Sequence, residues 1–137
     1  GGMQMNIQEM ATAVTQGTNI TICILNNYYL GMVRQMQQLF YGKRYIATCL
    51  RRRPGCPNDC KGPNKACPPY TPDFVKLAES YGAYGIRVEK IEDMDAAFEE
   101  AKKHTDAPTI IEFMISTDEL VLPMVKGGNP MSEMILK

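Results

Sequence analysis

Tryptophan is absent from this chain, and histidine occurs only once, as His104. A single histidine disfavours any histidine-based mechanism within the chain. Basic and acidic residues balance at 15 each, and a net charge of zero gives no support for nucleic-acid binding. No apolar run approaches the roughly 20 residues of a membrane span, so no membrane contact is expected. The polar start does not resemble a signal peptide, which makes a cytoplasmic location the expectation.

The composition that remains is that of a globular protein, with 45% hydrophobic and 22% charged residues. A length of 137 residues is enough for one domain with its own core. Spacing and capping patterns predict the regular elements. The predicted helices are 5–14 (with Asn6 as a possible N-cap), 31–40, 74–81 and 94–104, and the predicted strands are 20–25, 85–88 and 109–115. Helices that alternate with apolar strands predict an α/β fold, a doubly wound parallel sheet.

Two of these elements carry more specific expectations. Residues 20–25 are a continuous β-branched apolar run, typical of a strand buried on both faces, with Cys23 as a small buried residue. The helix that follows places Met32, Met36 and Leu39 on one side.

Two asparagines, Asn26 and Asn27, end the first strand, and Gly31 follows shortly after them. Asparagine offers a neutral oxygen ligand that Mg²⁺ accepts, and backbone carbonyls can complete the coordination shell. Ligands of open α/β sheets bind beyond the carboxyl ends of the strands, and glycine permits close backbone approach. The pattern indicates a metal-diphosphate site, although the asparagine pair alone is more typical of a turn.

The wider sequence strengthens the metal-diphosphate interpretation. The segment Asn26–Tyr45 (NNYYLGMVRQMQQLFYGKRY) resembles the thiamine-diphosphate motif of acetohydroxyacid synthase, also called acetolactate synthase, in its large catalytic subunit. Met5–Val14, Tyr70–Val88 and Leu120–Ile135 are similar to other segments of that family. The resemblance covers nearly the whole chain except an insert between Cys49 and Cys67. It implies a partial thiamine-diphosphate-binding domain with its first strand missing.

The resemblance also implies roles for individual residues. Asn27 would bind Mg²⁺ through its side chain and Tyr29 through its main-chain carbonyl. The charged ligand would be an Asp immediately before Gly1. Gly1 would then be the last residue of a Gly-Asp-Gly motif. The other explanation of Gly1 and Gly2 is a tag remnant. The residues implied to bind the cofactor are Gly1, Gly2, Asn27, Tyr28, Tyr29, Leu30, Gly31 and Met32. For Tyr28, a plain surface aromatic remains the alternative.

Three positions would line the substrate channel in the family: Met32, Val33 and Met36. Core packing is an equal alternative for Met32 and Val33. Met36 departs from the family, which usually carries tryptophan there, and this leaves the shape of the channel in doubt. The tail from Leu122 to Gly128 resembles a segment near the channel mouth, with a plain loop as an equal alternative.

The family is a thiamine-diphosphate-dependent transferase of branched-chain amino-acid biosynthesis. It decarboxylates pyruvate and joins the two-carbon product to a second 2-oxo acid, giving acetolactate or acetohydroxybutyrate. The resemblance implies no catalytic residue in this chain, since the activating Glu lies in an N-terminal domain and most of the FAD site in a middle domain. A homodimer of catalytic subunits and a regulatory small subunit are the implied partners. The fragment alone is expected to be inactive and, with an open sheet edge, to self-associate.

The domain organisation expected from these segments is a cofactor-binding domain over residues 1–117, with a Cys-rich insert at 49–67, and a tail over 118–137. The insert holds Cys49, Cys56, Cys60 and Cys67. Four cysteines so close together in a cytosolic protein favour a metal, Zn²⁺ or an iron–sulfur cluster, over disulfides. Disulfides and free thiols stay open, because the spacing is not that of paired CxxC motifs. The neighbouring run 51–53 (RRR) is either a solvated rim or a means of lowering thiol pKa.

Two further functions remain as alternatives. One is another thiamine-diphosphate lyase, such as a 2-oxo acid decarboxylase, against which the runs 31–35 (GMVRQ) and 122–125 (LPMV) argue. The other, of a different class, is a non-catalytic metal module built around the four cysteines.

Overall fold

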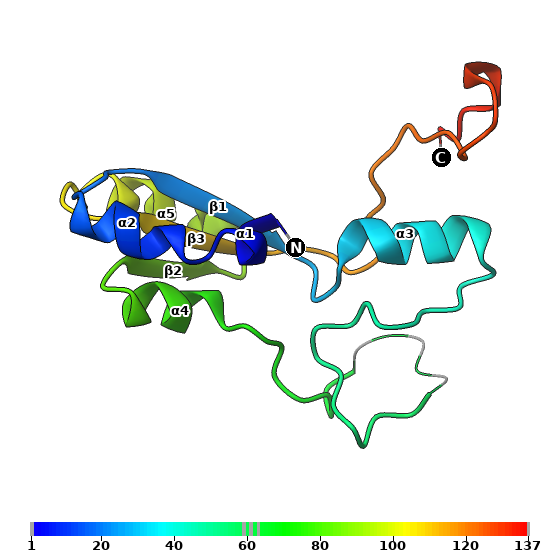
Figure 1. Cartoon of the computed structure of the whole chain (residues 1–137), viewed down its shortest axis with the longest axis horizontal. Helices are drawn as coiled ribbons and strands as arrows, with labels where there is room; N and C mark the ends of the chain where they lie inside the picture. Colours follow the sequence, from blue (N-terminus) through cyan, green and yellow to red (C-terminus); the bar gives the residue numbers. More distant parts are fainter. Residues whose placement is uncertain (1, 59, 61, 63, 137) are drawn as a thin grey trace. The chain divides into compact units, whose positions relative to one another are not determined.

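The computed structural model describes residues 2–58, 60, 62 and 64–136 (Figure 1). The elements in chain order are α1 (Gly2–Met5), α2 (Glu9–Thr15), β1 (Thr21–Asn26), α3 (Gly31–Phe40), α4 (Phe74–Ser80), β2 (Tyr84–Val88), the 3-10 helix η1 (Ile91–Asp93), α5 (Met94–Ala101), β3 (Thr109–Met114) and the 3-10 helix η2 (Met131–Glu133). The chain forms two compact units. Unit 1 comprises Gly1–Asn27 and Thr71–Ile115, and unit 2 comprises Tyr28–Tyr70 and Ser116–Lys137.

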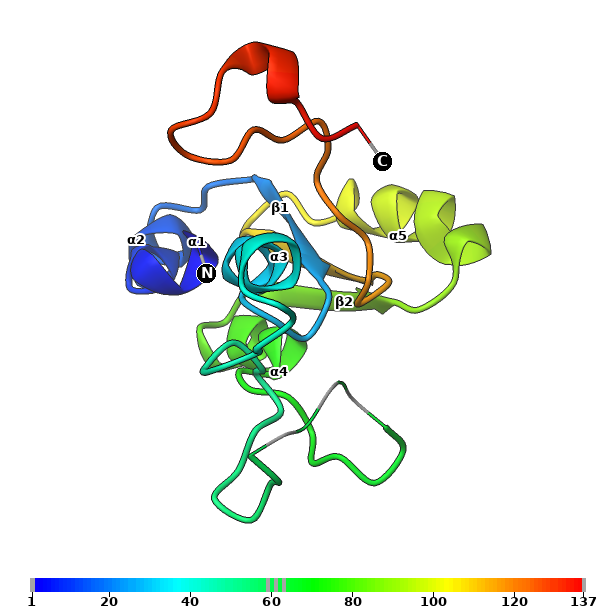
Figure 2. The same ribbon diagram turned by 90° about the vertical axis from the view of Figure 1, so that its right-hand side faces the viewer.

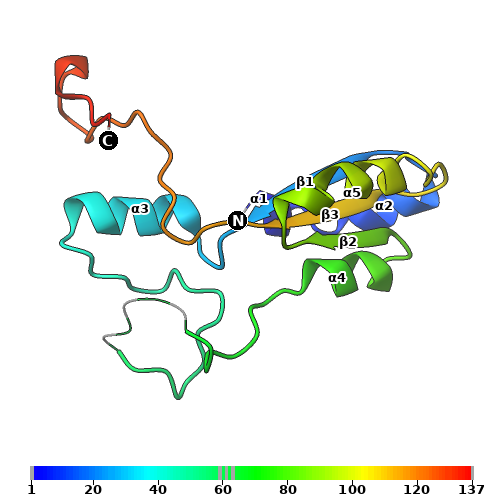
Figure 3. The same cartoon turned by 180° about the vertical axis from the view of Figure 1, so that it is seen from behind.

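Unit 1 is built on a three-stranded parallel sheet in the order β1-β3-β2. Thr109 at the start of β3 pairs with Thr21 of β1 and Tyr84 of β2. Helix α5 lies behind the sheet in Figure 1 and in front of it in Figure 3, on the opposite side from α2. Figure 2 shows α4 and α5 on either side of the sheet. The parallel α/β architecture predicted from the alternation of elements is confirmed.

The core of unit 1 is centred on β3, the strand between the other two. Ile110 and Ile111 are completely buried there. On one side of the sheet a cluster forms from Val88, Ala97, Ala101 and Ile111, with Ile86, Phe98 and Phe113 packed against it. Small alanines on α5 let this helix approach the sheet closely, which is how a short helix covers it.

The burial predicted for the first strand is wrong. β1 alternates between exposed and half-buried side chains, and Leu25 is 67% exposed. Cys23, expected to be buried, is also exposed. The reason lies in strand order: β1 is an edge strand of the sheet, whereas β3 takes the central, covered position. The strand buried along its length is therefore β3.

The helices begin and end close to their predicted positions, with two differences. α3 spans the predicted range, and α4 starts after Asp73 as expected. The first predicted helix is instead two pieces, α1 and α2, and Gln8 holds the N-cap position of α2, so the prediction of Asn6 as that cap is wrong. α5 ends at Ala101, earlier than predicted.

Unit 2 contains α3, the Cys-rich insert and the C-terminal segment. Over its described residues the insert consists of turns and bends. The C-terminal segment folds back on itself through an antiparallel bridge between Met124 and Ile135. The domain boundaries expected from the sequence stay a prediction. Among the described helices of both units, none is long and apolar enough to cross a membrane.

Candidate functional site

The carboxyl end of β1 is held by a buried polar cluster within unit 1. Asn26 is 4% exposed and donates a hydrogen bond from Nδ2 to Oε1 of Glu112 at 2.6 Å. Glu112, completely buried in β3, also accepts a hydrogen bond from Nε of Arg87 at 2.9 Å. The Asn26 carbonyl accepts from the backbone N–H of Ile115. The first asparagine of the pair is thus a structural residue that fixes the strand end.

Asn27 comes directly after this fixed strand end and is half-buried. It is the last residue of the first segment of unit 1. Gly2 is an exposed residue at the start of α1, and a Cβ added to it would meet nothing within 4 Å. Gly1, also expected to bind the cofactor, lies outside the described residues. The structural role described above belongs to Asn26. A metal-binding role for its neighbour Asn27 remains a prediction.

The loop that enters α3 is fixed by the segment that opens the Cys-rich insert. Tyr28 has a φ of +67°, a left-handed conformation that is uncommon for a non-glycine residue and reverses the chain. The Tyr28 carbonyl accepts from Leu50 N–H and the Leu30 N–H donates to the Thr48 carbonyl, both at 2.8 Å. These bonds flank an antiparallel bridge between Tyr29 and Cys49. The main-chain carbonyl of Tyr29 as a ligand of Mg²⁺ stays a prediction.

The side chains of this loop are packed within unit 2. Tyr29 is 7% exposed, and burial, reinforced by nearby Cys49, raises the pKa of its phenol to about 12. Tyr28 is half-buried, with its ring edge-on to Tyr70 at 5.5 Å and the Arg51 guanidinium 5.3 Å from its centroid. The choice between a cofactor-binding role and a plain aromatic on the turn stays a prediction for Tyr28. Both tyrosine rings contact other side chains of unit 2.

α3 begins at Gly31, and its first turn is free of acidic residues. The amino end of a ten-residue helix carries unpaired N–H groups and a partial positive charge, both of which favour a diphosphate. Met32, Val33 and Met36 are 50%, 49% and 38% exposed. They therefore do not serve as core of this chain, and the prediction that they line a substrate channel remains open.

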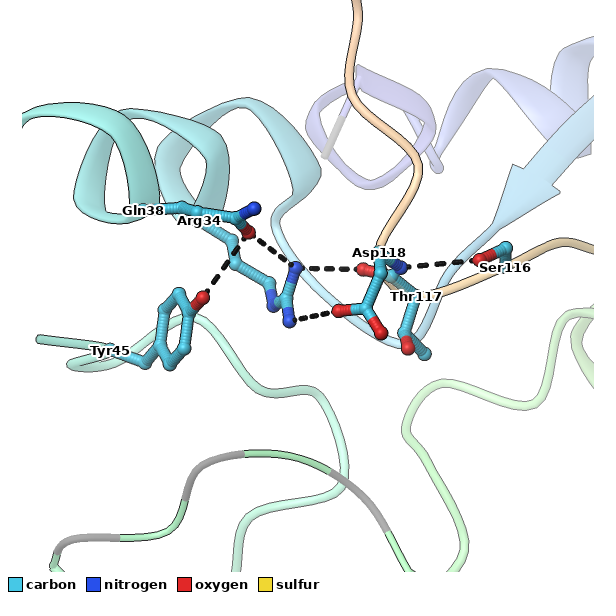
Figure 4. Close-up of polar contacts among 6 residues, drawn as sticks. All are labelled: Arg34, Gln38, Tyr45, Ser116, Thr117 and Asp118. Atoms are coloured by element: carbon cyan, nitrogen blue, oxygen red, sulfur yellow. Dashed lines mark hydrogen bonds and ion pairs between the residues drawn. The ribbon is translucent and has the colours of Figure 1, made fainter. Parts of the chain in front are cut away.

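The buried side of α3 is polar, and sequence reasoning missed this. Arg34 is 4% exposed, and Figure 4 shows its polar contacts. Its guanidinium donates to the Thr117 carbonyl at 2.8 Å and to Oδ1 of Asp118 at 2.7 Å. It also lies 4.6 Å from the ring centroids of both Tyr29 and Tyr45, a cation–π arrangement on two rings. Arg34 thus connects the cofactor-loop tyrosine to the C-terminal segment.

Gln35 makes the second connection to the C-terminal segment. Its Nε2 donates to the Val121 carbonyl and its Oε1 accepts from the Val121 N–H, both at 2.8 Å. Nε2 also lies 3.3 Å from the sulfur of Met124. The runs 31–35 and 122–125, which argue against a decarboxylase, are therefore in contact through Gln35 and Met124. The signal available in the sequence was the pair of adjacent polar residues Arg34 and Gln35, which stands between the apolar residues Val33 and Met36.

The four insert cysteines line one small cavity of about 30 Å³ in unit 2, together with Tyr29 and Arg51. All four are free thiols. Nevertheless, the described part of the chain holds no group of three His, Cys, Asp or Glu side chains placed to hold a metal ion. The cysteines share a cavity without being gathered around one point.

The fold and this loop define the class of protein. The chain belongs to the family of thiamine pyrophosphate enzymes, specifically the C-terminal TPP-binding domain, whose sequence model matches residues 1–113. This assignment agrees with the parallel sheet and with a glycine-started helix after its first strand.

Individual relatives give a narrower picture. The chain is 40% identical over 133 residues to the acetolactate synthase large subunit of Corynebacterium glutamicum, covering 97% of this chain and 19% of that protein. It is 38% identical over 131 residues to the mitochondrial acetolactate synthase catalytic subunit of Saccharomyces cerevisiae, covering 96% of this chain and 16% of that protein. The chain therefore spans about a fifth or less of the length of these relatives.

A solved structure is similar as well. The thiamine diphosphate-dependent 4-hydroxybenzoylformate decarboxylase of Rhodococcus jostii matches with a TM-score of 0.61 and 28% identity. The match covers 88% of this chain and 19% of the decarboxylase. The fold predicted from sequence is thus the fold of a thiamine diphosphate enzyme.

Proposed function

We propose that this chain is the C-terminal cofactor-binding part of an acetolactate synthase catalytic subunit. The observation that carries this proposal is 35–40% identity over nearly the whole chain to acetolactate synthases from bacteria and yeast. The proposed reaction decarboxylates pyruvate and joins the two-carbon product to a second 2-oxo acid. Acetolactate or acetohydroxybutyrate results, as required for branched-chain amino acids.

The residues of the loop suit the diphosphate and its magnesium. Asn27 supplies a neutral side-chain oxygen and Tyr29 supplies its main-chain carbonyl, both oxygen ligands of the type that Mg²⁺ accepts. The Gly31 end of α3 supplies backbone N–H donors to the diphosphate. These oxygens are neutral, so the charge of the ion must be met by the diphosphate and by a carboxylate from elsewhere in the protein. Thiamine diphosphate supplies the carbanion-stabilising chemistry when bound.

The remaining parts of the proposal concern what this chain positions. Met32, Val33 and Met36 project from α3 and would shape the entry for the 2-oxo acids. Arg34 and Gln35, on the other side, hold the C-terminal segment against the helix. The activating Glu, most of an FAD site, a second catalytic subunit and a regulatory small subunit lie outside this chain in the proposal. The chain alone is inactive, and the protein is cytoplasmic.

The test uses the protein expressed from its complete gene. It is incubated with pyruvate, thiamine diphosphate, Mg²⁺ and FAD, and acetolactate is measured as acetoin after acid treatment. The substitution Asn27→Ala should raise the Mg²⁺ requirement by at least about tenfold, a scale known for residues that support metal ligands. Asn19→Ala, an exposed asparagine in the loop before β1, is the matched control and should leave the requirement unchanged.

A second candidate function is a 2-oxo acid decarboxylase. It is favoured by the similarity to the Rhodococcus decarboxylase and by methionine at position 36, where the synthase family usually carries tryptophan. In the same assay this function yields acetaldehyde in place of acetolactate. A folded, cofactor-loaded protein that yields neither product would contradict both candidates.

A further inference from the structure

The insert brings its four cysteines to one place. Cys49, Cys56, Cys60 and Cys67 all line the cavity of about 30 Å³ in unit 2. A cavity of this size admits a small occupant such as a single ion. The fifth cysteine of the chain, Cys23, lies in β1 of unit 1 and is exposed. The insert thus places four of the chain's five cysteines around one cavity of unit 2.

Two of these cysteines are presented by turns with the same hydrogen bonds. In the turn 53–56, the Arg53 carbonyl accepts from Cys56 N–H at 3.0 Å, and the Arg53 N–H donates to Cys56 Sγ at 3.3 Å. In the turn 64–67, the Asn64 carbonyl accepts from Cys67 N–H at 3.1 Å, and the Asn64 N–H donates to Cys67 Sγ at 3.2 Å. Both cysteines are thus presented by the same backbone arrangement, in which a main-chain N–H donates to the sulfur.

Arginine side chains near the start of the insert form hydrogen bonds with the backbone at its end. The Arg51 guanidinium donates to the carbonyls of Cys67 and Pro68, both at 2.7 Å. The Arg53 guanidinium donates to the Pro69 carbonyl at 2.9 Å. These bonds join the segment 51–53 to the segment 67–69, so Arg51 and Arg53 are not merely a solvated rim. Arg51 and Arg52 also line the cavity, where their charge offsets the negative charge of a tetrathiolate site.

The first cysteine is attached to the loop that leads into α3. Cys49 pairs with Tyr29, and the Tyr29 side chain lines the same cavity as the four cysteines. A ligand bound to the cysteines would therefore stabilise or change the conformation of residues 28–30, because Tyr29 is paired with Cys49.

We propose that Cys49, Cys56, Cys60 and Cys67 bind one thiophilic metal ion, Zn²⁺, as a tetrahedral four-thiolate site. Each coordinating thiol releases its proton to solvent, and no electron transfer is involved. Because the sulfurs line the cavity without surrounding one point, the ion draws the two turns inward and folds the insert around itself. The site is separate from the proposed magnesium site and holds whether or not the protein is an acetolactate synthase.

The test measures metal content of the protein expressed from its complete gene and purified in the presence of a reductant. Wild-type protein should retain about one zinc ion per chain, as expected for a closed four-cysteine site. Cys56→Ser and Cys67→Ser should each lose most of the zinc. The matched control Cys23→Ser removes a cysteine outside the cavity and should retain all of it.

A second measurement needs no variant, in case the serine variants fail to fold. A mercurial reagent added to the wild-type protein should release zinc in proportion to the thiols it blocks, as detected by a chromogenic zinc indicator. Replacement of zinc by Co²⁺ should give the visible bands of tetrahedral cobalt and sulfur-to-cobalt charge transfer. Thiols that all react freely in zinc-loaded protein, disulfides between these cysteines in freshly purified protein, or iron with acid-labile sulfide would each overturn the proposal.

Discussion

Glu112 stands in the central strand β3 with no surface exposed to solvent, and side chains from both neighbouring strands bind its carboxylate. Asn26 of β1 donates to one carboxylate oxygen, and Arg87 of β2 donates to the other. A buried carboxylate is tolerated only when it is paired and hydrogen-bonded. This arrangement links β1, β3 and β2 through side-chain hydrogen bonds at the carboxyl end of β1, directly before Asn27.

We expect Glu112→Gln to destabilise unit 1 by about 2–3 kcal/mol. This is somewhat less than the ~3–5 kcal/mol for a fully buried pair, because the Arg87 side chain is one-third exposed. The readout is amide hydrogen exchange of β2 and β3 in the complete protein, which should accelerate by about one to two orders of magnitude. Glu99→Gln, at an exposed pair with Lys102, should change these rates little. Unchanged exchange in Glu112→Gln would show that the pair does not hold the sheet.

At the scale of elements, α4 is held at its start by a carboxylate with two partners. Asp73 accepts from Lys76 N–H at 3.3 Å as the N-cap and pairs with Arg87 at 2.6 Å. Burial opposes the charged form, but the Lys76 N–H and the Arg87 guanidinium outweigh it. They hold the pKa of Asp73 below its ordinary value of 3.8.

Asp73→Ala should therefore destabilise α4 by about 1 kcal/mol at neutral pH, the usual cost of a lost N-cap. Since the pKa in the folded state is lowered, the stabilisation is present above the ordinary pKa and is lost as the pH falls through the folded value. The difference in exchange of α4 amides between wild type and variant should be constant above about pH 5 and shrink below about pH 4. Glu79→Ala, exposed on the same helix, is the control. A difference that stayed constant to the lowest pH would argue against a charged cap.

The elements themselves were largely predictable from the sequence. α3, α4, β2 and β3 were found within a few residues, because apolar periodicity, an Asp cap and terminal glycines act over short distances. The order of the strands was not, because pairing depends on contacts between residues far apart in sequence. That is why β1 was assigned the burial that belongs to β3.

At the scale of the whole molecule, the C-terminal segment depends on α3 for its anchorage. Arg34 binds Thr117 and Asp118, and Gln35 binds both peptide groups of Val121 (Figure 4 shows the arginine contacts). Hydrogen bonds from a charged donor contribute about 1.5–3 kcal/mol when buried. The segment 116–125 should therefore open readily once these bonds are lost.

Arg34→Met keeps the length and apolar stem of the side chain but removes its donors. We expect hydrogen exchange over residues 116–121 to accelerate by about tenfold or more, given the energy of such bonds. Arg44→Met replaces an exposed arginine of unit 2 and should leave this segment unchanged. Equal rates in the two variants would show that Arg34 does not anchor the segment.

The family of this protein could be inferred from contiguous residues alone. The run 26–45 and the alternation of elements led to a thiamine diphosphate-binding α/β domain, because local patterns and cofactor motifs lie in contiguous residues. The roles of Glu112, Arg34 and Gln35 follow from the folded structure, because their partners are distant in sequence. Arg87 lies more than twenty residues from Glu112, and Thr117 and Val121 lie more than eighty residues from Arg34 and Gln35. The folded structure also places the four insert cysteines around one cavity. Their spacing alone does not predict this, because it depends on the turns of the insert and on hydrogen bonds such as that from Arg51 to the Cys67 carbonyl.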